Sequence, residues 1–193
     1  MKYAAVDIGN VCISIDKTAP LRGMGLSEDS TLPDELAVYV KQFEFGLIDE
    51  NEFFCQLSTI PVCRNLSRNE LESLYDSILL EPVPGMKELL LELPEIGVTP
   101  VFFSDISTFH LNGCFKRFPE MRSFEGIFSF DHGAYKPDKI MFNAFEAKYG
   151  KPVVYTDDRM DLINGALQNN WNAHCFVSAD NLREQIIQAL ENL

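Results

Sequence analysis

Four polar groups in this chain have side chains that could act together on a phosphoryl group. They are Asp7, Ser104–Asp105, Lys136 and Asp157–Asp158. Carboxylates hold hard divalent cations, and Mg²⁺ combines a few of them with several water ligands. A serine hydroxyl and a lysine ammonium can bind phosphoryl oxygens. An aspartate beside such a cation is also a suitable nucleophile for phosphoryl transfer through an aspartyl-phosphate.

Three of these groups directly follow short apolar runs that are typical of buried strands. Asp7 follows Tyr3–Val6, and the other two follow residues 98–103 and 153–156. The lysine belongs to Lys136–Pro137–Asp138, which opens a helical pattern. In an open parallel sheet, ligands bind outside the carboxyl ends of the strands. A single aspartate at a strand end is more often a helix cap, so the inference of one shared site rests on the joint arrangement.

The elements that must position these groups alternate along the chain. Helical patterns separate the apolar runs, which is typical of βαβ units and of a parallel sheet buried on both faces. The pattern predicts strands over 3–6, 98–103, 126–130, 152–156 and 173–177. It predicts helices near 85–93, 107–117, 138–149, 160–169 and 180–191. We therefore expect an α/β fold with a Rossmann-like parallel sheet sandwiched by helices.

The pattern of apolar residues differs over 17–81, where it predicts helices only. Pro33 is placed for a first helical turn, and Gly46 can end that helix. Asp49 with Glu52, and Ser67 with Glu70, have the spacing of capping boxes. We expect a small helical cap over 17–81, inserted after the first strand into a catalytic core of residues 1–16 and 82–193.

The composition limits the class of protein. The chain has 193 residues, a formal net charge of −13 and five cysteines without a CxxC pair. One domain with a small insert fits this length. Nucleic acid is not expected as a partner, because a phosphate-tracking surface needs clustered lysine and arginine. We expect no membrane partner, reduced thiols, a cytoplasmic location, and a monomer or homodimer.

The motifs resemble those of the haloacid dehalogenase (HAD) superfamily of aspartate-nucleophile hydrolases. Residues 7–11 (DIGNV) resemble the first motif, Ser104 the second, Lys136–Asp138 the third and Asp157–Asp158 the fourth. Their order and the helical insert between motifs one and two also match, over essentially the whole chain. The branch most similar is that of glucose-1-phosphatase-like phosphatases, which resemble the N-terminal domain of soluble epoxide hydrolase. Its cap signatures are similar to the stretches at 43–57 and 81–90.

The resemblance implies Mg²⁺-dependent hydrolysis of a small phosphate monoester, such as a sugar phosphate. It makes Asp7 the nucleophile that carries the aspartyl-phosphate, with Ser104 and Lys136 as its catalytic partners. The phosphate site that it implies comprises Asn10, Ser104, Asp105 and Lys136. The implied metal site comprises Asp7, the backbone carbonyl of Gly9, Asp157 and Asp158.

Three positions depart from the family pattern. Gly9 stands where many relatives have an aspartate that serves as acid and base, a role worth roughly 100- to 10,000-fold in rate. Asp105 stands where the branch usually has asparagine, and its carboxylate would repel phosphate unless protonated or paired with Lys136. The alternative is that Asp105 caps the helix that begins near Ser107. Leu162 replaces a polar residue of the metal loop, and Asp161 could substitute for it.

These departures keep two alternatives open. The first is a catalytically weak binding or regulatory protein on the same scaffold. The second is a 2-haloacid dehalogenase, whose relatives also lack the second aspartate of the first motif. A metal-free dehalogenase has no use for two adjacent carboxylates, so Asp157–Asp158 favours a phosphatase over the second alternative.

Overall fold

The computed structural model describes residues 1–27 and 34–192. Its centre is a five-stranded sheet in which every neighbouring pair is parallel. The strands follow the order β5-β4-β1-β6-β7. They are β1 (Lys2–Val6), β4 (Val98–Ser104), β5 (Gly126–Phe128), β6 (Val154–Asp157) and β7 (Ala173–Cys175). The predicted parallel sheet is confirmed, and its central strands β4, β1 and β6 are the ones that the polar groups follow.

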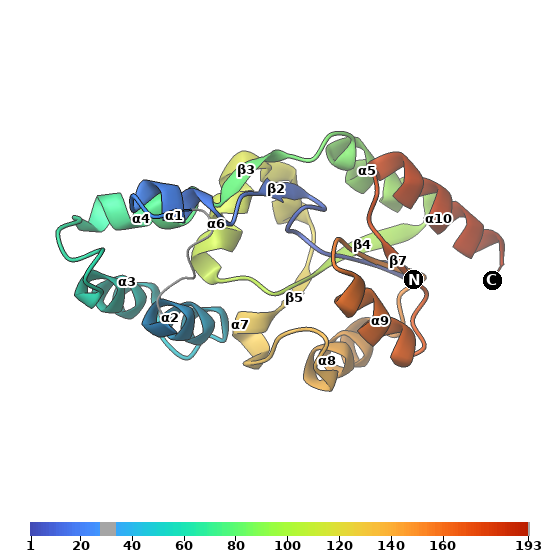
Figure 1. Cartoon of the computed structure of the whole chain (residues 1–193). Coiled ribbons are helices and arrows are strands. Elements are labelled where there is room, and N and C mark those ends of the chain that lie inside the picture. The colour runs from blue at the N-terminus through green and yellow to red at the C-terminus, as the bar shows by residue number, and fades with distance from the viewer. Residues whose placement is uncertain (28–33, 193) are drawn as a thin grey trace.

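Helices cover both faces of this sheet (Figure 1). Along β1, Ala4 and Val6 pack into one apolar cluster and Ala5 into another, because successive side chains of a strand point to opposite faces. The first cluster includes residues of α5 (Met86–Glu92), α6 (Thr108–Arg117) and α10 (Ala179–Glu191). The second includes residues of α8 (Lys139–Tyr149) and α9 (Met160–Gln168). The sheet is therefore buried on both faces, as the continuous apolar runs predict.

Short elements connect these layers. They are the 3₁₀ turns η1 (Leu93–Ile96) and η2 (Pro119–Ser123), and the helix α7 (Ser129–His132). The prediction of a strand over 126–130 is wrong at its end, since β5 stops at Phe128 and Ser129 begins α7. The buried Ser129 hydroxyl donates to the carbonyl of Ile106 (3.1 Å) and accepts from its N–H (2.9 Å). These bonds tie the start of α7 to the loop after β4.

Four helices lie together at the end of the molecule remote from the two termini (Figure 1). They are α1 (Ala19–Gly23), α2 (Asp34–Glu44), α3 (Glu50–Thr59) and α4 (Arg68–Asp76). Their buried faces form a cluster of their own, comprising Leu36, Phe43, Phe53, Phe54, Leu57, Ile60, Cys63, Leu71 and Tyr75. We call residues 19–76 the helical segment. The predicted first turn at Pro33 lies outside the described residues.

The predicted helix signals of this segment are present. The Asp49 side chain accepts from the N–H of Glu52 (2.9 Å) at the start of α3. Ser67 and Glu70 form a reciprocal capping box at the start of α4. Gly46 follows α2 with a φ of +66°, and a Cβ there would lie 2.2 Å from the carbonyl oxygen of Phe130. Glycine is therefore required where the helical segment approaches α7.

The prediction of helices only over 17–81 is wrong at its end. Residues 79–82 form β3 (Leu79–Pro82), which pairs antiparallel with β2 (Ile13–Ile15). The sequence hides this small sheet, because β3 has four residues and Glu81 and Pro82 are both disfavoured in strands. The chain passes from the core to the helical segment through β2 and returns through β3. The domain limits at 16/17 and 81/82 stay predictions.

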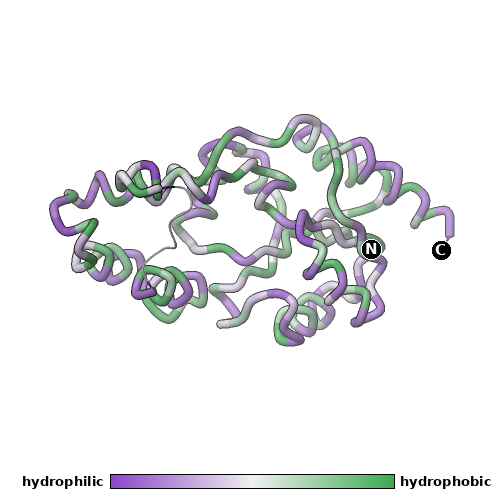
Figure 2. Tube along the Cα trace, in the orientation of Figure 1, coloured by the Kyte–Doolittle hydropathy of each residue, from purple (hydrophilic) through white to green (hydrophobic). Residues whose placement is uncertain are grey.

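Hydrophobic and hydrophilic residues alternate along the trace of the outer helices (Figure 2). Such alternation is typical of helices with one face on a core and one in water. Among the described residues, none of the helices combines the length and apolar character needed to cross a bilayer.

Candidate active site

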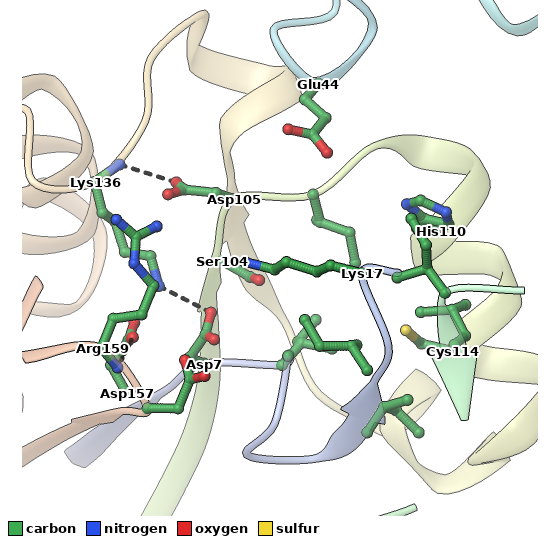
Figure 3. Close-up of a pocket in the computed structure, with 18 of the residues that line it drawn as sticks. Asp7, Lys17, Glu44, Ser104, Asp105, His110, Cys114, Lys136, Asp157 and Arg159 are labelled. Carbon is green, nitrogen blue, oxygen red and sulfur yellow. Dashed lines mark hydrogen bonds and ion pairs between the residues drawn. The ribbon is translucent and has the colours of Figure 1, made fainter. Parts of the chain in front are cut away.

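A cavity of about 480 Å³ lies between the sheet and the helical segment. Asp7, Ser104 and Asp157 enter it from the carboxyl ends of β1, β4 and β6, together with Asp105 and Lys136 (Figure 3). The opposite wall is formed by residues of α2, α4 and the β2–β3 pair. The structure thus brings together side chains that are far apart in the sequence, as the strand-end pattern predicts.

The buried ammonium of Lys136 links the strand ends. Its Nζ donates to Oδ1 of Asp7 (2.8 Å), to Oδ2 of Asp157 (2.6 Å) and to the carbonyl oxygen of Phe103 (2.8 Å). The ammonium therefore uses all three N–H bonds within the protein. Only 1 % of the Lys136 side chain is exposed. The positive charge of Lys136 compensates the negative charges of the buried Asp7 and Asp157 carboxylates, which would be costly to bury without a cation.

Asp157 is fixed from several sides. Its side chain is fully buried, and Oδ2 also accepts from the hydroxyl of Tyr155 (2.5 Å). Its Oδ1 accepts from the backbone N–H of Arg159 (3.0 Å). These bonds fix the carboxylate at the end of β6 and leave it little freedom to turn.

Three carboxylates gather around one point beside Lys136. One oxygen each from Asp7, Asp157 and Asp158 lies within 4.8 Å of the other two. Asp158 is the most exposed of the three. The first and fourth motifs predict that the carboxylates of Asp7 and Asp158 lie close together, as they do here. The cluster is the part of the site that has the chemistry to hold a divalent cation.

Asn10 lies beside this cluster. Its side-chain amide donates to Oδ2 of Asp158 (2.9 Å), and its Oδ1 accepts from the backbone N–H of Ile15 (3.0 Å). Its φ is +53°, a left-handed conformation that asparagine tolerates better than most residues. The structure thus shows Asn10 orienting a carboxylate of the cluster. Its contact with phosphate stays a prediction.

Gly9 lies in the same turn after β1. A Cβ at this position would lie 3.9 Å from Oδ2 of Asp7 and 3.3 Å from Cδ1 of Ile15. A side chain here would therefore start next to the carboxylate of Asp7, and glycine leaves that space open. The role of its carbonyl oxygen as a metal ligand stays a prediction.

The carboxyl group of Asp7 has a raised pKa. Burial raises its pKa to about 6, an effect that Lys136 opposes and the charge of Asp157 reinforces. The hydroxyl of Ser104 also acts on Asp7, and its hydrogen bond lowers the pKa. Because Lys136 and Ser104 both favour the ionised form, they support Asp7 as a carboxylate nucleophile at neutral pH.

Asp105 has a different partner from either alternative that the sequence leaves open. Its Oδ1 accepts from the backbone N–H of Lys136 (2.9 Å), so it does not pair with the ammonium. It does not cap α6 either, because Ser107 is the N-cap and accepts from the N–H of His110 (3.2 Å). Burial raises the pKa of Asp105. The carboxyl group positions the Lys136 loop at the cavity wall.

Asp161 does not take the place of the missing polar residue in the fourth motif. Its carboxylate pairs with the guanidinium of Arg159 (2.6 Å) outside the cluster. Leu162 is buried and lines the cavity. The cavity wall is therefore apolar where the family pattern has an amide or carboxylate.

Glu44, the last residue of α2, lines the cavity from the helical segment and is not among the site residues predicted from the sequence. The hydroxyl of Tyr135 donates to its Oε2 (2.6 Å). Burial raises the pKa of Glu44 to about 7. A signal was available, because Glu44 stands four residues after Val40 and eight after Leu36, and both of these residues are apolar.

This pKa predicts a pH-dependent gain of stability for Glu44→Gln. Between about pH 4.5 and 7 the folded wild type keeps a proton that the unfolded chain has lost, so its free energy of unfolding falls as pH rises. Glutamine removes this loss. We expect the variant to gain roughly 2–3 kcal/mol relative to wild type between about pH 4 and 8. Urea unfolding across this range measures it, with Glu35→Gln, an exposed position of α2, as the control; a pH-independent difference would contradict the prediction.

The sequence and the fold were compared with those of known proteins. No family model and no curated protein matches the chain. Among solved structures, a HAD family enzyme from Bacteroides thetaiotaomicron has 20% identity, a TM-score of 0.80, and coverage of 92% of this chain and 94% of that one. The same enzyme was crystallised with magnesium and inorganic phosphate (TM-score 0.77, 20% identity, 92% and 95% coverage). A predicted HAD-like family hydrolase from Porphyromonas gingivalis has 18% identity, 98% coverage of both chains and a TM-score of 0.77. The chain therefore has the fold of HAD family enzymes over nearly its whole length.

Proposed function

We propose that this protein is a Mg²⁺-dependent phosphatase of the HAD type, which hydrolyses a small phosphate monoester through an aspartyl-phosphate on Asp7. The observation that carries the proposal is the meeting of Asp7, Asp157, Asp158 and Lys136 at the carboxyl ends of parallel strands. The fold supports it, because a HAD family enzyme of the same fold was crystallised with magnesium and inorganic phosphate.

The donor set fits Mg²⁺. Three carboxylate oxygens lie within 4.8 Å of one another, while opposite ligands of an octahedral Mg²⁺ lie about 4.2 Å apart. A small movement of Asp158, the most accessible of the three, would close the difference. Asp7 and Asp158 would hold the ion, and the buried Asp157 would support it. When bound, Mg²⁺ neutralises charge on the phosphoryl oxygens and aligns the phosphoryl group for attack.

The protein's own side chains account for the remaining chemistry of the first step. The ionised carboxylate of Asp7 attacks phosphorus in line with the bond to the leaving group, and its oxygen forms the acyl-phosphate bond. The hydroxyl of Ser104 and the positive charge of the buried Lys136 ammonium lie beside Asp7 and stabilise the negative charge on the phosphoryl oxygens. Water then hydrolyses the acyl phosphate and restores Asp7.

The residues of the cavity wall opposite the carboxylates indicate which kind of leaving group the site favours. This wall is largely apolar and includes Ile13, Ile15, Val40, Ile78 and Leu79. It favours a leaving group with substantial apolar surface, whereas the sugar phosphate that the family resemblance implies is more polar and stays a prediction. The helical segment supplies part of this wall, so we propose that it acts as a cap that excludes bulk water and selects the substrate.

A panel of phosphate monoesters, assayed with Mg²⁺ and with a chelator, tests the proposal. We expect release of inorganic phosphate from at least one aryl, alkyl or sugar ester with Mg²⁺, and a loss of at least roughly 100-fold with the chelator. Asp158→Asn removes one carboxylate from the site, so it should raise the Mg²⁺ concentration needed for half-maximal activity. Equal phosphate release with and without the metal would contradict the Mg²⁺ dependence. Release from none of the esters would contradict the proposal and favour the binding protein.

A further inference from the structure

The helical segment places a carboxyl group where a leaving group would need a proton. An alkoxide is a poor leaving group, so a phosphatase gains from an acid beside the departing oxygen. The turn after β1 supplies none, because Gly9 has no side chain. The carboxylates of Asp7 and Asp157 are both bound to the ammonium of Lys136. A proton donor must therefore come from elsewhere in the cavity.

We propose that Glu44 is the general acid of the first step and the general base of the second. The assignment rests on the proposed phosphatase function. Asp7 attacks from the sheet, and in-line displacement sends the leaving oxygen away from Asp7, toward the side formed by the helical segment. Glu44 reaches into the cavity from that side, whereas Asp7 and Ser104 enter from the strand ends (Figure 3).

The hydrogen bonds of Glu44 favour a carboxylic acid with its proton directed at the cavity. Tyr135 donates to Oε2, which makes that oxygen the carbonyl-like acceptor. No residue in the described part of the chain hydrogen-bonds to Oε1, so this oxygen is the one that can carry the proton. The ring of Tyr135 packs edge-on against Phe45 at 4.5 Å between centroids, which holds the hydroxyl in place.

The surroundings keep Glu44 protonated near neutral pH. Burial and the charge of Asp105, after β4, raise its pKa, while Tyr135, on the loop after α7, and Lys17, before α1, lower it. Tyr75 of α4 also faces Glu44 and is neutral at this pH. A group with a pKa of about 7 can both donate and accept a proton under neutral conditions.

The two steps balance through Glu44. In the first, the oxygen of Asp7 bonds to phosphorus, the bond from phosphorus to the leaving oxygen breaks, and the proton on Oε1 moves to that oxygen. An alcohol and a Glu44 carboxylate result. In the second, the carboxylate takes a proton from water as the water oxygen bonds to phosphorus and the bond to Asp7 breaks. Inorganic phosphate leaves and Glu44 is protonated again.

Two esters with different leaving groups test the assignment. An alkyl phosphate needs the proton, whereas p-nitrophenyl phosphate releases a stable phenolate without it. Since kcat/KM reports the first irreversible step, Glu44→Gln should lower kcat/KM for the alkyl ester by roughly 100- to 10,000-fold. It should leave kcat/KM for the aryl ester within about threefold, which also shows that the variant is folded. The fall of wild-type kcat/KM for the alkyl ester above about pH 7 should disappear in the variant.

The controls separate this assignment from the proposed function. Glu35→Gln makes the same change on an exposed turn of α2 and should leave both esters unaffected. Tyr135→Phe removes a bond that lowers the pKa of Glu44, so it should move the alkaline fall to higher pH. Equal loss on both esters, or no loss on either, would overturn the Glu44 assignment alone. Inactive wild type on both esters with Mg²⁺ would overturn the proposed function and the assignment with it.

Discussion

Asp7→Asn is expected to abolish phosphate release while leaving the fold intact. The amide can still accept the bond from Lys136, so the buried ammonium keeps its partner. The amide nitrogen cannot form the acyl phosphate, and we expect kcat to fall by at least roughly 10,000-fold. Phosphate release in single and multiple turnovers measures the effect, with thermal unfolding as the check on the fold.

Asp49→Asn is the matched control for this substitution. Asp49 caps α3 in the helical segment, and asparagine caps a helix about equally well. The control should keep wild-type activity. If Asp7→Asn retained wild-type turnover of an ester that the enzyme hydrolyses, another group would have to attack phosphorus.

Among the substitutions proposed here, Lys136→Met is expected to cause the largest loss in the free energy of unfolding. It leaves the carboxylates of Asp7 and Asp157 buried without their cation, and the carbonyl of Phe103 without its donor. Removing one partner of a buried ion pair costs about 3–5 kcal/mol, and we expect a loss of that size in the free energy of unfolding at neutral pH without metal.

The loss should shrink as pH falls. The pKa of Asp7 is already raised to about 6, and without Lys136 it would rise further, so protonation relieves the buried charge in acid. Urea unfolding at about pH 7 and pH 5 measures the change. Lys148→Met removes an exposed lysine paired with Glu125 and should leave the free energy of unfolding nearly unchanged, because water screens such surface pairs. A loss for Lys136→Met that is equally small, or the same at both pH values, would contradict a charge-compensating role.

The sequence predicts the sheet well, and the reason is physical. Residues 3–6 and 98–103 are apolar on both alternating faces, a pattern that fits only strands buried between two layers of helices. Polar residues that follow such strands must lie at one edge of the sheet. This constraint predicts the meeting of Asp7, Ser104 and Asp157, which the cavity lining confirms.

Features that depend on tertiary packing escape the sequence. The pairing of β2 with β3 joins short segments separated by the whole helical segment, and neither has a strand period long enough to detect. Asp105 could pair with an ammonium or cap a helix by its position alone; only the folded loop shows it bound to the backbone of Lys136. Glu44 becomes part of the site only because α2 packs over the strand ends.

Rapid acid quenching with peptide mass spectrometry detects the proposed phosphoryl group on Asp7. The enzyme is mixed with Mg²⁺ and an aryl ester that it hydrolyses, quenched during the first turnover, and digested. Wild type and Glu44→Gln, in which the second step should be slow, are compared with Asp7→Asn. The account predicts one phosphoryl group on the peptide that contains Asp7, most abundant in Glu44→Gln and absent in Asp7→Asn. Phosphate release without any phosphorylated peptide, or a phosphoryl group on another residue, would contradict it.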